Sequence, residues 1–140
     1  MERQIGFEVR ALMNLLARKA ASCEKSNQCN TDLHGMVIDF LMNNKETEIY
    51  QKDIELEFSM RRSTASRMLK LMEQNGMVKR LHVCGDLRLK KVQLTEQAIL
   101  SHEGISLYRQ NIEQELRNEV SEEELGIFFK VIDKLKENIS

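Results

Sequence analysis

The stretch from Glu48 to Thr95 restricts the possible folds of this chain more than any other part of the sequence. Its pattern predicts a short helix over Gln51 to Phe58 and a second helix over Arg62 to Asn75, joined by a tight turn at Ser59-Met60-Arg61. Gly76 follows directly, and glycine most easily adopts the left-handed conformation that ends a helix. With the two strands that come next, the layout is a helix-turn-helix followed by a wing, which can place one helix in a groove of DNA.

The wing is expected to be a two-stranded hairpin. Its strands are predicted at Met77 to Val83 and at Arg88 to Leu94, around a turn at Cys84-Gly85-Asp86-Leu87. In the second strand Val92 and Leu94 alternate with polar residues, which is the period-two pattern of a half-buried strand.

Charge is distributed very unevenly along the chain. Residues 61–91 hold nine cations and two anions, a net charge of +7, although the whole chain has 21 Lys and Arg against 22 Asp and Glu. The remaining residues therefore hold 12 cations and 20 anions, a net charge of −8. A polyanionic partner explains this segregation better than a uniformly solvated surface does.

The rest of the chain reads as helix, so the fold class is mainly α with a small β-hairpin wing and six helices. The other helices are expected at about 1–23, 30–43, 96–119 and 121–138, with a polar connector at 24–29 and a single short strand at Ile49. Thr95 can cap the long helix, and Ser121 with Glu124 forms a capping box. The length favours a single domain, residues 1–140, in which residues 30–95 form the winged lobe.

The two helices of the helix-turn-helix each have a predicted core side. Ile54, Leu56 and Phe58 are expected to supply the apolar contacts of the short helix, and Ala65, Met68, Leu69 and Met72 those of the second. The opposite side of the second helix offers guanidinium, ammonium and hydroxyl groups that can reach bases or phosphates: Arg61, Arg62, Ser63, Thr64, Ser66, Arg67 and Lys70. The alternative interpretation is a solvated helix face with scattered arginines.

Basic residues also gather on the hairpin. Arg88 lies just beyond the predicted turn, and Lys90 and Lys91 follow on the returning strand. A basic wing tip can enter the minor groove or contact phosphates, and Asp86 is placed to orient the Arg88 guanidinium by a charge-assisted hydrogen bond. Alternatively, these cations only protect an exposed strand edge from pairing.

The terminal helices, within residues 1–29 and 96–140, carry more apolar surface than a small winged lobe can cover. This excess predicts a homodimer interface made by Leu12, Leu16, Phe128, Phe129, Ile132 and Leu135. A two-fold dimer would present two recognition helices to half-sites about 34 Å apart. The alternative is that these helices fold back on their own domain.

With these features together, the chain resembles the MarR family of bacterial transcriptional regulators. The resemblance covers nearly the full length and is carried by RRSTASRMLKLMEQNGMVKR and by Asp86-Leu87-Arg88 followed by Leu94-Thr95. It implies a homodimer that binds pseudo-palindromic double-stranded promoter DNA, usually as a repressor. It also implies release by a small, often phenolic, effector bound between the dimerisation helices and the lobe.

The resemblance further implies roles for single residues. Arg62, Ser63, Thr64, Ser66 and Arg67 would face the major groove, and Arg88 the minor groove. The chain departs from the family pattern at Arg61, where a small polar capping residue is more frequent. It departs again at Leu87, where a second arginine is frequent, so that the wing would depend more on Lys90 and Lys91.

Other functions leave weaker traces in the sequence. Cys23, Cys29 and His34 could supply three ligands to a metal such as zinc, but their spacing fits no closed site, and we expect no metal. Cys23, Cys29 or Cys84 could also sense oxidants, although reduced thiols are expected in a cytoplasmic chain without an export signal or membrane span. His102 has no evident partner.

Enzymatic function has no support in the sequence. No catalytic or cofactor-binding motif is apparent, and we expect neither an enzyme nor a cofactor. The remaining alternatives are a redox or metal sensor on the same scaffold, or a winged-helix module that binds an acidic protein.

Overall fold

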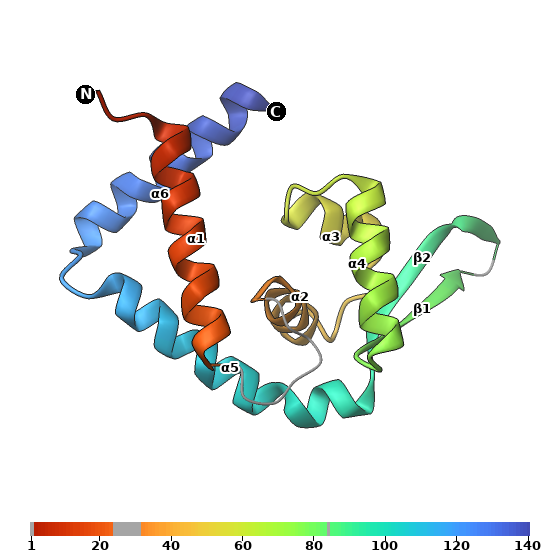
Figure 1. The fold of residues 1–140 in the computed structure, drawn as a ribbon. Coiled ribbons are helices and arrows are strands. Elements are labelled where there is room, and N and C mark those ends of the chain that lie inside the picture. Colours follow the sequence, from red (N-terminus) through yellow and green to blue (C-terminus); the bar gives the residue numbers. More distant parts are fainter. Residues whose placement is uncertain (1, 24–31, 84) are drawn as a thin grey trace. The chain divides into compact units, whose positions relative to one another are not determined.

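The computed structural model describes residues 2–23, 32–83 and 85–140, and these form two compact units, Met1–Ile105 and Ser106–Ser140. The first unit contains α1 (Ile5–Cys23), α2 (Asp32–Asn43), α3 (Gln51–Glu57), α4 (Arg62–Gln74) and the strands β1 (Val78–Val83) and β2 (Asp86–Leu94). Helix α5 (Glu96–Arg117) begins in the first unit and ends in the second, which also contains α6 (Glu122–Ile139) (Figure 1). The predicted mainly helical class with six helices and one hairpin is confirmed for the described part of the chain.

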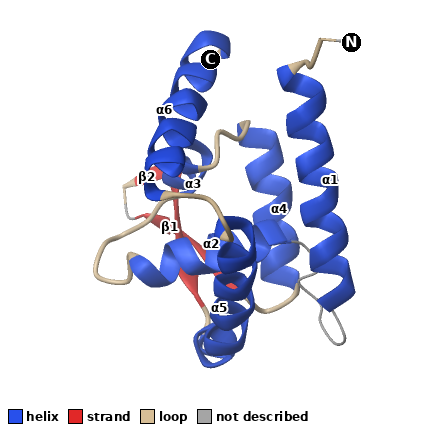
Figure 2. Ribbon diagram, turned by 90° about the vertical axis from the view of Figure 1, so that its left-hand side faces the viewer, coloured by secondary structure: helices blue, strands red, loops and turns tan. Residues whose placement is uncertain are grey.

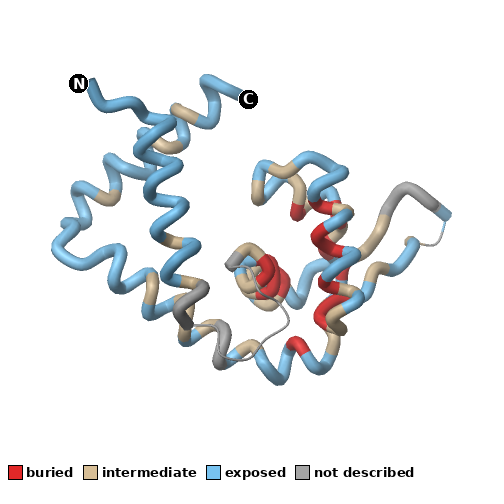
Figure 3. The backbone as a smooth tube through the Cα atoms, in the orientation of Figure 1, coloured by how far each residue is buried: buried red, intermediate tan, exposed pale blue. Residues whose placement is uncertain are grey.

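The core of the first unit lies among α2, α3, α4 and the hairpin, with Ala98 of α5 completing it (Figure 3). The fully buried large side chains are Val37, Ile38, Ile54, Leu69 and Met72. The predicted core side of α4 is confirmed, since Ala65, Met68, Leu69 and Met72 are all buried. The expected connector 24–29 and the first two positions of the helix expected over 30–43 lie outside the described residues.

Helix α3 shows one error in the predicted core. Ile54 is buried, and Phe58 packs edge-on against Phe40 with 6.0 Å between ring centroids. Leu56, however, is 71% exposed, so its predicted core contact is wrong. The reason is geometric: Ile54 and Phe58 are four residues apart and share a helix face, whereas Leu56 points about 200° away from Ile54.

The turn between α3 and α4 occurs where it was predicted. Ser59 adopts a positive φ of 51°, and the Met60 amide donates to the Glu55 carbonyl at 2.8 Å. Helix α4 ends at Gln74, and Gly76 has the left-handed φ of 75° that was expected after the helix. The two helices of the helix-turn-helix are therefore joined by local backbone hydrogen bonds.

The hairpin is antiparallel, and its turn is tighter than predicted (Figure 2). Val83 pairs with Asp86, so Asp86 and Leu87 belong to β2 and not to the turn. Gly85, with a φ of 95°, makes this short connection possible, because only glycine takes such a conformation freely. At the base of the hairpin, the Val92 amide donates to the Ile49 carbonyl at 2.8 Å, and Tyr50 forms an isolated bridge with Lys91 in place of the short strand expected at Ile49.

Helices α5 and α6 begin at the predicted caps. Thr95 Oγ1 accepts from the Ala98 amide at 3.1 Å and donates to the Gly76 carbonyl at 2.6 Å. Ser121 Oγ accepts from the Glu124 amide at 3.1 Å, and Glu124 Oε1 accepts from the Ser121 amide at 3.0 Å, which completes the capping box. These hydrogen bonds hold the pKa of the Glu124 carboxyl below its usual value.

Helices α1 and α6 carry large apolar side chains that remain open to solvent. Phe128 and Phe129 are 47% and 48% exposed, and none of the described residues of α6 is buried. In α1 most apolar residues, such as Phe7 and Leu12, are likewise exposed. Within the described residues, we find no helix whose length and apolar character would let it cross a membrane.

Candidate nucleic-acid interface

The exposed side of α4 brings together most of the residues predicted to contact DNA. Opposite its buried face, the helix exposes Arg62, Ser63, Thr64, Arg67 and Lys70, and Arg61 is exposed at the N-cap. The first turn contains no acidic residue among its described positions. Because the N-terminal end of a helix carries a partial positive charge, cations there are unfavourable without a partner, and an anionic phosphate would relieve this repulsion.

Arg61 begins α4 without capping it through its side chain. Its backbone is extended, with φ −70° and ψ 151°, and its carbonyl accepts from the Ala65 amide at 3.0 Å. The described Arg61 side chain makes no capping hydrogen bond. This residue type is uncommon at an N-cap, where short polar side chains are preferred, but it leaves an exposed guanidinium at the helix start.

Ser66 differs from the other predicted contacts on α4. It is half-buried, and its Oγ lies 3.5 Å from Nη1 of Arg80 on β1. Arg80 in turn donates from Nε to Glu73 Oε1 at 2.8 Å. Ser66 is thus linked to a polar contact between α4 and β1, a link that the sequence pattern did not predict.

The predicted wing contacts are described only in part. The side chains of residues 86–89 lie outside the described set, so the orientation of Arg88 by Asp86 remains a prediction. Lys90 is half-buried and pairs across the hairpin with the exposed His82. The backbone register therefore puts at least these two residues on opposite strands of the wing.

Lys91 lies at the base of the wing and already has an anionic partner. Its Nζ is 3.3 Å from Glu48 Oε1, and Glu48 also accepts from the Tyr50 hydroxyl at 2.8 Å. Together the Tyr50 and Lys91 contacts lower the pKa of the Glu48 carboxyl, while the hydrogen bond to Glu48 raises the pKa of Tyr50. These three residues join β2 to the segment before α3.

Some relevant residues were missed by reasoning from sequence. Lys79 is exposed on β1 and adds a cation beside α4 that was not among the predicted contacts. The inward orientation of Arg80 could have been predicted from strand alternation. Arg80 lies two residues after the buried Val78, so both side chains face the same side of the strand. Glu48 and Tyr50 gave no such signal, because their contact with Lys91 depends on tertiary pairing.

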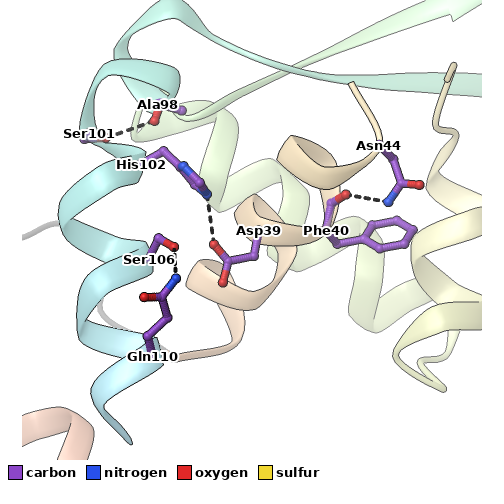
Figure 4. A network of polar contacts seen from close by, with 8 residues as sticks. All are labelled: Asp39, Phe40, Asn44, Ala98, Ser101, His102, Ser106 and Gln110. Atoms are coloured by element: carbon purple, nitrogen blue, oxygen red, sulfur yellow. Dashed lines mark hydrogen bonds and ion pairs between the residues drawn. The ribbon is translucent and has the colours of Figure 1, made fainter. Parts of the chain in front are cut away.

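His102 does have a partner, contrary to the expectation from sequence. Its Nε2 lies 3.1 Å from Asp39 Oδ1, which joins α5 to α2 within the first unit (Figure 4). The two residues are 63 positions apart, so no local pattern could reveal the contact. Both side chains are partly exposed, at 21% and 23%, and a pair in that environment contributes modestly to stability.

Most of the cysteine and histidine side chains considered above as metal ligands or redox sensors lie outside the described part of the structure. Cys29, Cys84 and the side chain of Cys23 lie outside the described residues. His34 is buried, and burial lowers the pKa of its imidazole. Among the described residues, no three metal-binding side chains come together.

A surface pocket of about 250 Å³ lies between the end of α2, the 44–49 segment, β2 and the start of α5. Its apolar lining comes from Leu41, Ile49, Val92, Leu94 and Ile99. Lys91 and Glu48 lie at the same pocket, so it combines apolar surface with a polar pair. Sites for drug-sized molecules usually have volumes of at least about 300 Å³. This pocket is slightly smaller, so it could hold only a smaller molecule.

The helix-turn-helix, the basic outer face of α4 and the adjoining hairpin define a winged helix-turn-helix protein. A model of the MarR family matches residues 31–88, which span most of this lobe. The structure is similar to the transcription regulator MarR from Oenococcus oeni PSU-1, with 26% identity, a TM-score of 0.79 and coverage of 96% of this chain and 99% of that one. The lobe is therefore similar to the MarR family, and the whole structure is similar to a MarR transcription regulator.

Two further proteins are similar to this chain along nearly its whole length. The S. aureus MepR–DNA complex is similar over 99% of this chain and 100% of the MepR chain, with 21% identity and a TM-score of 0.87. YdgJ from Bacillus subtilis (strain 168), described as an uncharacterized HTH-type transcriptional regulator, is 24% identical over 139 residues. That alignment covers 99% of this chain and 81% of the relative.

Proposed function

We propose that this protein is a homodimeric transcriptional regulator, most simply a repressor, that binds a pseudo-palindromic site in double-stranded DNA. The observation that carries the proposal is the outer face of α4, where four cations and two hydroxyl side chains are exposed opposite a fully buried apolar face. A helix supported in this way can enter the major groove without disturbing the core. The S. aureus MepR–DNA complex, whose fold is similar, supports the same use of the lobe.

Different residues of α4 and the wing would contact different parts of the DNA. Arg62 and Arg67 are suited to guanine edges or phosphates, while Ser63 and Thr64 can donate to either. Lys70 and Arg61 would contact phosphates at the two ends of the helix. In the wing we assign DNA contact to Arg88 and Lys90, while Lys91 would have to exchange Glu48 for a phosphate.

The exposed apolar side chains of α1 and α6 support dimerisation. Leu12, Phe128 and Phe129 are each more than 40% exposed, and Leu16, Ile132 and Leu135 are half-buried. A second copy of the chain would remove this apolar area from water. The dimer would then hold two copies of α4 at a spacing of about one DNA turn, roughly 34 Å.

A small aromatic effector would modulate DNA binding. The pocket beside Lys91 offers a place for it within the first unit. A phenolate or carboxylate could compete there with Glu48 for the Lys91 ammonium. Thermal-shift measurements with phenols and aromatic carboxylic acids test this, and Lys91→Met should abolish any shift that arises in this pocket.

The proposed role is binding without catalysis, and it places the protein in the cytoplasm with the chromosome. The test is selection of bound fragments from genomic DNA, followed by gel-shift titration of the selected fragment. Arg67→Gln should weaken binding at least about tenfold, and the slope of log affinity against log salt should fall by about 0.9 for each lost phosphate contact. Failure of the purified dimer to bind any fragment even at low salt would contradict the proposal and favour an acidic protein as the partner.

A further inference from the structure

Arg80 belongs to the basic segment, residues 61–91, but its side chain faces inward. Its side chain is only 14% exposed, and its guanidinium Nε donates to Glu73 Oε1 at 2.8 Å. The second carboxylate oxygen of Glu73 accepts from the Arg80 backbone amide at 3.3 Å. Glu73 therefore holds both the side chain and the backbone of one residue of β1, and the Arg80 charge is neutralised within the protein.

This contact spans the corner where α4 turns into β1. The path of the corner is set by backbone hydrogen bonds, with the Gly76 amide donating to Glu73 and the Met77 amide to Met72 at 3.0 and 2.9 Å. Thr95 fixes the same corner from the other side, through its hydroxyl bond to the Gly76 carbonyl. Further along β1, Arg80 pairs with Val92 of β2, and the Glu73 carboxylate adds a second restraint on the strand at the same residue.

A small rotation at Arg80 would move the wing tip considerably. At about 3.3 Å per residue, Val83 at the end of β1 lies about 10 Å along the strand from Arg80, so a swing of about 9° displaces that end by about 1.5 Å. A displacement of that size is enough to break a hydrogen bond to DNA, because such bonds need donor and acceptor within about 3.2 Å. The angle between α4 and the wing thus decides whether both can contact one duplex at the same time.

We propose that Arg80 is a positioning residue for DNA recognition: through Glu73 it fixes the wing relative to the recognition helix, and it does not contact DNA itself. The inference rests on the proposed function and assigns to this residue the geometry of that same site. The long contact from Nη1 to Ser66 Oγ extends the effect into α4. Because arginine can only donate, it leaves the Ser66 hydroxyl proton available for an acceptor on DNA.

The Glu73→Gln variant separates positioning from simple electrostatics. Loss of this anion makes the segment more positive, so electrostatics alone predicts tighter binding to any DNA. Loss of the Arg80 restraint instead predicts weaker binding to the selected fragment, by roughly tenfold, since a misplaced wing loses contacts worth about 1.4 kcal/mol. The measurement is a gel-shift titration of the folded dimer on the selected fragment and on a scrambled fragment of equal length.

Arg80→Lys tests the same idea without changing charge. Lysine keeps the cation but lacks the planar guanidinium that holds the carboxylate, so we expect a similar loss on the selected fragment and unchanged binding to the scrambled one. On the scrambled fragment the salt slope should stay the same, because Arg80 itself makes no phosphate contact. Lys79→Gln, at the exposed neighbouring position, is the matched control and should weaken both fragments by the same factor.

The outcomes distinguish this inference from the proposed function. If Glu73→Gln and Arg80→Lys leave the ratio of affinities for the two fragments unchanged, or weaken both fragments equally as a partly unfolded protein would, the positioning role is wrong. If Arg80→Met lowers the salt slope on the scrambled fragment by about 0.9, Arg80 contacts a phosphate directly, and the inference is also wrong. If the wild-type protein binds neither fragment, the proposed function itself fails.

Discussion

The winged lobe and the terminal helices differ in how far their apolar side chains are exposed to solvent. In the lobe, α2, α3, α4 and the hairpin enclose Ile38, Ile54 and Leu69 without any solvent exposure. In α1 and α6, by contrast, Phe7, Phe128 and other large side chains remain about half exposed or more. The lobe can therefore be stabilised by its own core, whereas the terminal helices need another surface to cover them.

The same difference distinguishes two structural properties, which are the shape of the surface that would contact DNA and the spacing between two such surfaces. The lobe holds the side chains that we propose contact DNA on a helix whose opposite face is buried in the core of the same chain. The terminal helices have well-formed ends, as the Ser121–Glu124 capping box shows, but no complete core of their own among the described residues. We infer that the fold of the reading surface is local to one chain, while the spacing of two such surfaces requires two chains.

The largest expected effect is in the lobe core. Leu69→Ala removes a fully buried side chain and should lower the free energy of unfolding by about 2–5 kcal/mol, because both transfer energy and packing are lost. Urea unfolding measures this. Leu56→Ala, at the exposed position on α3, is the control and should change the free energy by less than about 0.5 kcal/mol. Equal losses in both variants would mean that the division between core and surface is wrong.

The next effect is on the terminal helices. Phe129→Ala should weaken dimerisation by about 2 kcal/mol, a factor of about 30, because an aromatic anchor at an interface contributes on this scale. Sedimentation equilibrium measures the dissociation constant. Ile139→Ala is the matched control at the exposed end of α6 and should leave the dimer intact. A wild-type protein that remains monomeric at micromolar concentration would remove the contrast between the two regions.

A smaller effect concerns pH and belongs to the lobe. His34 is 4% exposed, and burial lowers the pKa of its imidazole in the folded state, so the unfolded chain binds this proton more readily. Stability should therefore fall as pH falls below the unfolded pKa of about 6.5, by at most about 1.4 kcal/mol per pH unit for one proton. Thermal melts between pH 5 and 8 should show less of this dependence in His34→Leu than in the wild type. An identical pH profile in both would contradict the assignment.

The smallest effect is expected at the link between α2 and α5. His102→Gln and Asp39→Asn should each destabilise the protein by less than about 1 kcal/mol, since the pair is partly exposed and screened by solvent. A double-mutant cycle isolates the coupling between the two residues. If the coupling proves negligible while DNA binding still changes, the contact positions α5 without stabilising the lobe.

Several features of the fold followed from short sequence spacings. The core face of α4, the left-handed Gly76, the Thr95 cap and the Ser121–Glu124 box all depend on residues within one helical turn of each other. The resemblance to the MarR family was likewise visible in the RRSTASRMLKLMEQNGMVKR segment, which lies within the part of the chain that the family model matches. These predictions succeeded because the backbone geometry of a helix or cap dictates which neighbours meet.

Tertiary structure decided the contacts that join distant parts of the chain. Lys91 and Glu48 are 43 residues apart and His102 and Asp39 are 63 apart, so their pairing depends on how the hairpin and α5 pack onto the lobe. The exposure of Leu56 was also settled by packing, because an apolar residue type does not reveal which side of a short helix faces the core. Sequence alone determined the local elements and the basic surface, and packing determined which cations remain free to reach DNA and which, like Arg80, are held by an internal carboxylate.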